Sequence, residues 1–155
     1  DTPHGAIVEH CSTAEPVLAT IGGLIRAHGG AALIIDYGGW RGTGDTFQAL
    51  RAHRMVDPLD DPGSADLTAH VRFADLAVWS DLPDVGFVGQ GAFLETRGIT
   101  ARAQALLRAG APADPLIGAL RRVTLPEERW TRFMVLGLTC PGEPPLPGFE
   151  DVPDG

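Results

Sequence analysis

The stretch AALIIDYGGWRGTG, residues 31–44, decides how the rest of this sequence is interpreted. Its first six residues form a continuous apolar run that ends in Asp36, which is typical of a buried parallel strand at its C-terminal end. The eight residues that follow make a glycine-rich loop. Ligands bind outside the carboxyl ends of strands in open α/β sheets. The stretch therefore predicts a buried strand, followed either by the edge of a binding site or by a flexible turn in which Asp36 caps a neighbouring segment.

Helices and short strands are expected to alternate on both sides of this stretch. The pairs Ser12/Glu15 and Asp45/Gln48 have the spacing of a capping box and predict a helix after each, the second running to His53. Such alternation indicates an α/β domain with a largely parallel sheet. The other expected elements are strands over residues 5–10, 85–88 and 132–138, helices over 73–79, 91–97, 100–109 and 114–122, a loop over 54–65, and a segment, 66–72, that fits strand or helix equally.

The composition excludes several classes of function. The 155 residues contain 12 basic side chains, all of them arginine, against 20 acidic ones, for a formal charge of -8. A chain without lysine cannot run a Walker A phosphate loop or a Schiff-base mechanism. The acidic balance argues against a nucleic-acid binder, and no apolar run is long enough for a membrane span.

The sequence gives little support for a metal site, a phosphate-binding loop or a nucleophile-elbow hydrolase. His53 and His70 can be drawn into a metal site with Asp45, Asp57 and Asp66, but no recognised ligand spacing joins them, and we expect no metal. The loop GGWRGTG, residues 38–44, could bind a phosphate or nucleotide, yet it lacks the usual fingerprint and has no lysine. There is no G-x-S-x-G nucleophile elbow.

Two further segments have a distinctive composition. Residues 141–155 hold proline, glycine and acid but no basic residue, so we expect a disordered tail. We interpret a group of arginines on the expected helices as a solvated face rather than an anion-recruiting patch. These arginines are Arg97, Arg102, Arg108, Arg121 and Arg122.

Five strings occur in order between residues 29 and 138: GGAALIIDYG, GDTFQALRAH, DPGSADLTAHVRF, GQGAFLETRGI and RFMVLGL. Together they resemble the C-terminal part of the MidA family of class I S-adenosylmethionine-dependent methyltransferases. Mitochondrial members of that family assist assembly of respiratory complex I by methylating an arginine of a core subunit. Each string alone is unspecific, whereas five in order over roughly residues 5–138 are fairly specific.

The resemblance implies a doubly wound, mostly parallel, Rossmann-like sheet, in which residues 31–36, 85–88 and 132–138 are the fifth, sixth and seventh strands. Residues 1–140 would form the C-terminal half of the methyltransferase domain. The cofactor, S-adenosylmethionine, would bind mainly to a glycine-rich turn upstream of Asp1. We therefore expect this chain alone to be inactive and to need the N-terminal half as a partner. Without that half, its exposed sheet edge and apolar faces predict homodimers, domain swapping or marginal stability.

The same resemblance places the site. Asp36, Asp66 and His70 would be its catalytic groups, and which of them removes the acceptor's proton stays open. The family usually has an acid where this chain has Arg72, which leaves the role of that segment in question. The remaining residues of the acceptor or cofactor pocket would be Tyr37, Gly38, Asp45, Thr46, His53, Thr68, Gln90 and Gly91.

The function expected from the sequence is thus part of a methyltransferase that acts on a protein arginine, such as one in a complex I core subunit. The location expected for it is the cytoplasm of a bacterium. The alternative is a truncated relative that serves as a non-catalytic interaction or assembly module.

Overall fold

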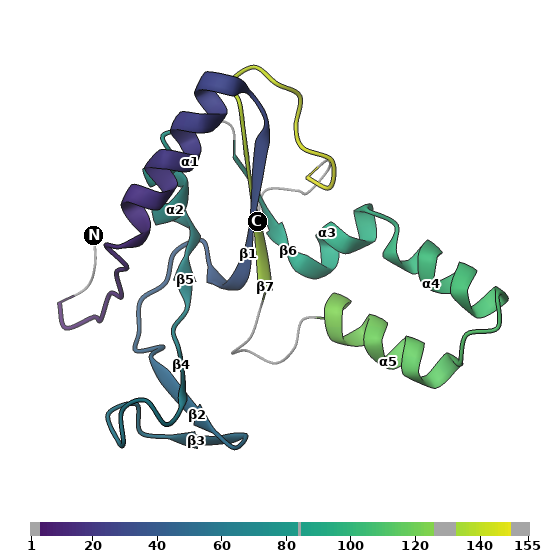
Figure 1. The fold of residues 1–155 in the computed structure, drawn as a ribbon, viewed down its shortest axis with the longest axis horizontal. Coiled ribbons are helices and arrows are strands. Elements are labelled where there is room, and N and C mark those ends of the chain that lie inside the picture. The colour runs from purple at the N-terminus through teal and green to yellow at the C-terminus, as the bar shows by residue number, and fades with distance from the viewer. Residues whose placement is uncertain (1–3, 84, 126–132, 150–155) are drawn as a thin grey trace.

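The computed structural model describes residues 4–83, 85–125 and 133–149. They form two sheets and five helices (Figure 1). The main sheet has the order β5-β1-β7-β6, and a smaller sheet has the order β3-β2-β4. The strands are β1 (Ala31–Gly39), β2 (Gln48–Arg51), β3 (Arg54–Val56), β4 (Asp66–Thr68), β5 (Val71–Arg72), β6 (Val85–Gly89) and β7 (Phe133–Thr139), and the helices are α1 (Ala14–His28), α2 (Phe73–Ser80), α3 (Gln90–Thr96), α4 (Ile99–Arg108) and α5 (Ala113–Thr124).

The last strand lies in the middle of the main sheet. β7 pairs with β1 on one side and with β6 on the other, antiparallel to both, so that Leu136 lies between Ile34 and Phe87. Only the short β1–β5 pairing is parallel. The α/β class is confirmed, but a mostly parallel sheet is wrong for the described residues. An apolar run reports that both faces of a strand are covered, and it does not report the strand's direction.

One face of the sheet carries the core. Helices α1 and α2 lie against it (Figure 1) and meet Met134, Leu136 and Leu138 of β7 with side chains that include Leu18 and Phe73. Both helices were expected, and so were α3, α4, α5, β6 and β7. α1 begins at Ala14, two residues after Ser12, and its N-cap residue makes no side-chain capping bond, so the capping box located this helix without forming.

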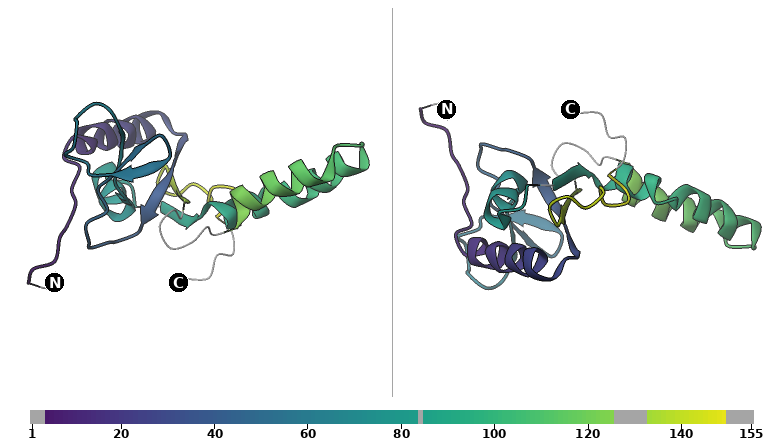
Figure 2. Two further views of the ribbon diagram at one scale, coloured as in Figure 1. Left: turned by 90° about the horizontal axis from the view of Figure 1, so that it is seen from below. Right: turned by 90° about the horizontal axis from the view of Figure 1, so that it is seen from above.

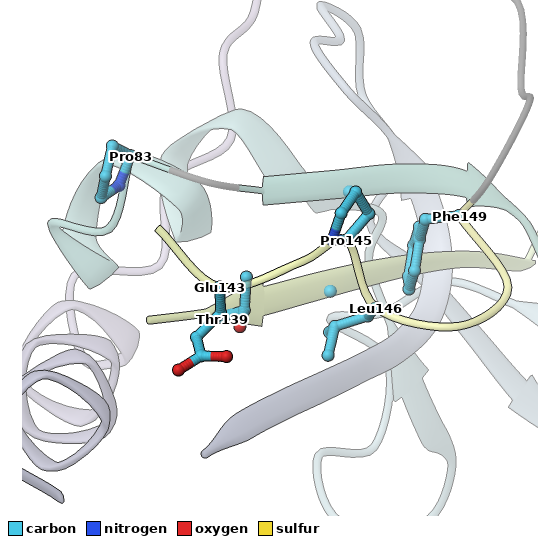
Figure 3. Close-up of a pocket in the computed structure, with 8 residues that line it drawn as sticks. Pro83, Thr139, Glu143, Pro145, Leu146 and Phe149 are labelled. Carbon is cyan, nitrogen blue, oxygen red and sulfur yellow. The ribbon is translucent and has the colours of Figure 1, made fainter. Parts of the chain in front are cut away.

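The opposite face of the sheet is only partly covered. Leu33 and Ile35 of β1 are 49% and 47% exposed there. Over β6 and β7, residues 141–149 run back across the sheet, and the ring of Phe149 lies beside Leu146 in this segment (Figure 3). We expected residues 141–155 to be disordered, but the described part, 141–149, is packed. Its sequence carries apolar side chains that fit a slot in the sheet.

That slot exists because two glycines are neighbours. Gly86 of β6 pairs with Gly137 of β7. A Cβ at Gly86 would lie 2.4 Å, and one at Gly137 2.7 Å, from ring atoms of Phe149. The missing side chains therefore let the aromatic ring rest on the backbone of the sheet.

The helix expected between Asp45 and His53 is wrong. Gln48–Arg51 and Arg54–Val56 are instead two antiparallel strands, β2 and β3, with Ala49 fully buried. Ala52 and His53 form the turn with φ of 49° and 62°, the values of a two-residue hairpin turn. A capping-box spacing is a local signal, and here strand pairing overrides it. The loop expected over residues 54–65 therefore begins with a strand, and residues 66–72 become β4 and β5.

The strand expected over residues 5–10 is also wrong. The segment has no strand assignment, and Ile7 and Val8 are exposed. It docks on the loop that follows β1, where the N–H of Gly44 donates to the carbonyl of Ile7 at 2.9 Å. An apolar run needs a partner strand to become part of a sheet.

Helices α3, α4 and α5 form an arm that leaves the sheet at β6. Figure 1 shows α4 and α5 side by side, and Figures 1 and 2 both show them extending away from the rest of the molecule. Gly98, at φ 82°, makes the turn between α3 and α4 that its place in the sequence predicts. No helix in the described ranges is long and apolar enough to cross a lipid bilayer.

The slot for Phe149 can be tested with alanine at Gly137. The new Cβ would displace the ring and release residues 141–149, lowering the free energy of unfolding by about 1–3 kcal/mol. Urea denaturation measures the loss, and chymotrypsin cleavage after Phe149, followed by mass spectrometry, should become faster. Gly89→Ala is the matched control, because nothing lies within 4 Å of a Cβ there. Equal effects of the two substitutions would contradict the slot.

Candidate functional site

A cavity of about 430 Å³ opens between the start of α1, the C-terminal half of β1, β5 and α2. Most of its wall is apolar, with Leu18, Ile34 and Trp79 among the lining residues. Its polar lining consists of Glu9, His10, Cys11, Asp36, His70, Arg72 and Asp75. Two of the three predicted catalytic residues, Asp36 and His70, thus meet in one cavity.

Asp36 owes its position to the alternation of β1. Ala32 and Ile34 pack on the core side, and Asp36 continues that series on the same face. One carboxylate oxygen, Oδ1, accepts the N–H of Tyr37 at 2.8 Å. No other hydrogen bond to Asp36 is present among the described residues, so Oδ2 can accept one from a ligand.

Tyr37, the next residue of β1, is not among the residues that line the cavity, but its ring contacts that of His70, which is. Tyr37 makes edge contacts with the rings of His70, at 6.1 Å, and Phe133, at 5.6 Å between centroids. Phe133 is its register partner on β7. These contacts place the His70 ring relative to the end of β1.

A threonine joins three separate segments at the rim of the cavity. The backbone N–H of Thr46 donates to Glu9 Oε1 at 2.9 Å, and its hydroxyl donates to Glu9 Oε2. The same hydroxyl oxygen accepts the N–H of His70 at 2.8 Å. Thr46 was a predicted pocket residue, whereas Glu9 was missed. The only sign of Glu9 was an acid inside a run that we interpreted as a strand.

Arg72 is compensated locally. Its Nε lies 3.4 Å from Asp75 Oδ2, and that Nε is buried with no hydrogen-bond partner among the described residues. With Glu9 and Asp36, three carboxylates in the cavity lining face one guanidinium. The balance of formal charge therefore favours a cationic ligand.

Gly38 allows β1 to pair closely with β5 beside the cavity. It pairs with Val71 of β5, and at φ 156° a Cβ would lie 2.1 Å from the carbonyl oxygen of Val71. Only glycine allows the two backbones to approach this closely. The sequence resemblance named Gly38 as a pocket residue, and the structure places it where the strand that carries Asp36 meets the segment that carries His70.

The other predicted site residues do not line this cavity. Asp66 and Thr68 lie in β4 of the small sheet, His53 is in the exposed β2–β3 turn, and Asp45 is exposed in the loop before β2. Within the described ranges, no group of three His, Cys, Asp or Glu side chains could hold a metal ion.

Gln90 and Gly91 start α3 and serve packing. Gln90 Nε2 donates to the carbonyl of Val123 at 3.2 Å, and a Cβ at Gly91 would lie 2.1 Å from the carbonyl oxygen of Thr124. Both contacts fasten α5 to α3. They lie beyond β7 from Asp36, because β7 separates β6 from β1.

Cys11 has a distinct electrostatic setting at the cavity rim. A hydrogen bond to the hydroxyl of Thr13, whose oxygen is 3.4 Å from the sulfur, and one to the N–H of Ala14 lower the pKa of the Cys11 thiol. The thiol is exposed.

Comparisons with known proteins agree with the resemblance found in the sequence. Residues 1–85 match the family model described as "Putative S-adenosyl-L-methionine-dependent methyltransferase". Over 102 residues the chain is 42% identical to the protein arginine methyltransferase NDUFAF7 of Xenopus laevis mitochondria, covering 64% of this chain and 23% of the relative. The homologue from Drosophila melanogaster is 35% identical over 137 residues, 84% of this chain and 31% of that protein.

A solved structure shares the fold. It is a protein from Burkholderia thailandensis bound to S-adenosyl-homocysteine, with a TM-score of 0.72 and 26% identity, and the match covers 89% of this chain and 38% of that one. The chain therefore spans well under half the length of each of these relatives.

Alanine at Gly38 should break the join between β1 and β5. The clash is with backbone atoms, which cannot rotate away, so we expect unfolding to become easier by about 1–3 kcal/mol or more. Amide hydrogen exchange at residues 71 and 72 should accelerate. Gly39→Ala is the matched control in the same strand, because its nearest neighbour would be the Arg41 carbonyl oxygen at 3.6 Å. A Gly38→Ala protein that behaves like the control would refute the close approach.

The reactivity of Cys11 should depend on Thr13. Because the Thr13 hydroxyl is the largest cause of the lowered thiol pKa, Thr13→Ala should shift the pH profile of Cys11 alkylation to higher pH. Iodoacetamide labelling from pH 6 to 10, with peptide mass spectrometry, measures this shift. Cys140 is the internal reference and should keep one profile in both proteins. An unchanged Cys11 profile would contradict the assignment. Helix α1 should survive, since Thr13 makes no side-chain cap bond to it.

Proposed function

The chain belongs to the MidA family of S-adenosyl-L-methionine-dependent methyltransferases, and from that premise we propose that it supplies the acceptor side of the active-site cleft, which receives an arginine side chain of a protein. The observation that carries the proposal is the Asp36 carboxylate in an apolar-walled cavity at the C-terminal half of β1.

The two parts of an arginine side chain, its apolar stem and its charged guanidinium, match the apolar wall and the carboxylates of this cavity. Its methylene stem can lie along the apolar wall while its guanidinium meets carboxylates. Asp36 has an oxygen that no other described residue occupies, and charge-assisted hydrogen bonds from guanidinium to carboxylate are strong and directional. The printed names of the frog and fly relatives, which are protein arginine methyltransferases, support the same choice of acceptor.

The residues of this chain would prepare the acceptor nitrogen. S-adenosylmethionine, when bound, supplies an electrophilic methyl group. Asp36 would hold an N–H of the guanidinium and orient it, and Asp36 or His70 would take the proton that the nitrogen loses when the new N–C bond forms. The Glu9–Thr46–His70 bonds would keep the imidazole segment in place during that transfer.

The remaining part of such a domain would complete the cleft. This chain covers 38% of the B. thailandensis structure, and Leu33 and Ile35 leave part of the β1 face exposed. We propose that a further segment covers that face and carries the main cofactor-binding turn, and that the isolated chain is inactive and prone to self-association. A complex I core subunit as acceptor and a bacterial cytoplasmic location belong to the same proposal.

Acceptor binding can be tested on the chain itself by NMR titration. The peptide Gly-Gly-Arg-Gly-Gly should shift the amide signals of Tyr37 and His70, whereas its citrulline analogue, which has the same shape without the charge, should not. Asp36→Asn should weaken binding about three- to tenfold. Asp60→Asn, which removes an exposed carboxylate outside the cavity, should not change it. Equal binding of the two peptides would overturn the acceptor assignment.

In the full gene product that carries this chain, Asp36→Asn should also lower transfer of labelled methyl about a hundredfold or more. Asp60→Asn again serves as the control. Unchanged transfer in Asp36→Asn would remove Asp36 from the reaction.

A further inference from the structure

We propose that the arm formed by α3, α4 and α5, residues 90–125, is a docking surface for an acidic segment of a protein partner. The proposal does not depend on methyl transfer. It rests on the placement of the arm, its exposed apolar side chains and its charge.

The arm has little contact with the body of the molecule. α3 packs on β6 and β7, whereas α4 and α5 pack mainly on α3 and on each other. In Figure 1, and in the views from below and from above in Figure 2, both helices stand clear of the sheet. Most of the surface of α4 and α5 is therefore open to a partner.

The two helices bury very little of their apolar surface. No residue of α5 is buried, and Ala103 is the one buried residue of α4. Leu106, Leu107 and Ile117 are exposed, Ile117 by 42%. A free-standing helical hairpin of this kind gains stability when a second surface covers its apolar side chains.

The charge of the arm is opposite to that of the rest of the chain. Residues 90–125 hold five of the 12 arginines and only two of the 20 acids, Glu95 and Asp114. None of the five arginines forms an ion pair within the described ranges, whereas Arg26, Arg51 and Arg72 of the body each pair with an aspartate. From the sequence alone we interpreted these five arginines as a solvated face. Their lack of ion pairs among the described residues, beside exposed apolar side chains, instead favours carboxylates on a partner, which arginine binds with two parallel hydrogen bonds.

The sequence also favours a protein over other anions. No aromatic residue occurs from residue 94 to 125, although interfacial membrane helices usually anchor with Trp, Tyr or Phe. The rest of the chain, with seven arginines and 18 acids, would be repelled by an anionic membrane or a nucleic acid. A short acidic protein segment with apolar side chains can bind the arm alone, without approaching the acidic body of the molecule.

Fluorescence anisotropy with the 155-residue chain tests the proposal at 100 mM NaCl, where charges beyond about 10 Å are screened. The probe is a fluorescein-labelled 16-residue peptide with the repeat Glu-Asp-Leu-Glu, and its comparison is the Gln-Asn-Leu-Gln version. The acidic peptide should bind, and raising the salt to 500 mM should weaken it. The double variant Arg102→Glu/Arg108→Glu should weaken it about tenfold.

Controls decide between this docking surface and a general effect of charge. Arg54→Glu, on the exposed strand β3 of the body, should leave binding unchanged. Circular dichroism checks that the helices persist, and Arg102→Gln/Arg108→Gln gives the same test with less repulsion if they do not. Absence of binding, equal binding of the neutral peptide, an equal loss in Arg54→Glu, or tighter binding to phosphatidylserine vesicles or single-stranded DNA would each overturn the proposal.

Discussion

The structure depends on the insertion of β7 between β1 and β6. Every residue from Met134 to Thr139 is buried, and the strand forms backbone hydrogen bonds on both sides. β1 precedes it in the chain by about a hundred residues, so this pairing closes a long loop before it gains any packing energy. In return, one strand orders the core under α1 and α2, the slot for Phe149, and the base of the α3–α5 arm.

The cavity is a consequence of how β1 ends. Its first residues alternate between the core and the open face, and the same alternation turns Asp36 into the cavity. At Gly38 the strand can approach Val71 only because a side chain is missing. That approach brings His70 near Tyr37, and Thr46 and Glu9 then fix the rim from two other segments. The site is therefore built from the end of β1, from β5, α1 and α2, and from the loop segments that carry Glu9, Thr46 and His70, and its geometry depends on the Gly38–Val71 contact.

Helices and strands with a clear apolar pattern could be predicted from the sequence. Features that depend on contacts between distant segments, such as strand pairing and strand direction, could not. The apolar stripe of α1 and the continuous run of β7 are visible in the local sequence. Asp36 and His70 were named from five strings that are specific only in combination, and the structure places both in the lining of one cavity. The hairpin turn at Ala52 and His53 could not be predicted, because Ala-His is not one of the dipeptides, such as Asn-Gly, that signal a two-residue hairpin turn. Glu9 was missed because its function comes from Thr46, 37 residues away. Strand direction was misjudged because burial looks the same in either orientation.

The net charge of the chain does not show how its positive and negative side chains are distributed over the molecule. The negative cavity lies toward the β5–β1 edge of the sheet, and the positive arm leaves from β6 at the other edge. A compact small molecule cannot use both features, since the whole sheet separates them. An extended protein can, if it presents an arginine to the cavity and an acidic stretch to the arm. In that arrangement the cavity selects the side chain and the arm selects the protein that carries it, so specificity would not depend on the cavity alone.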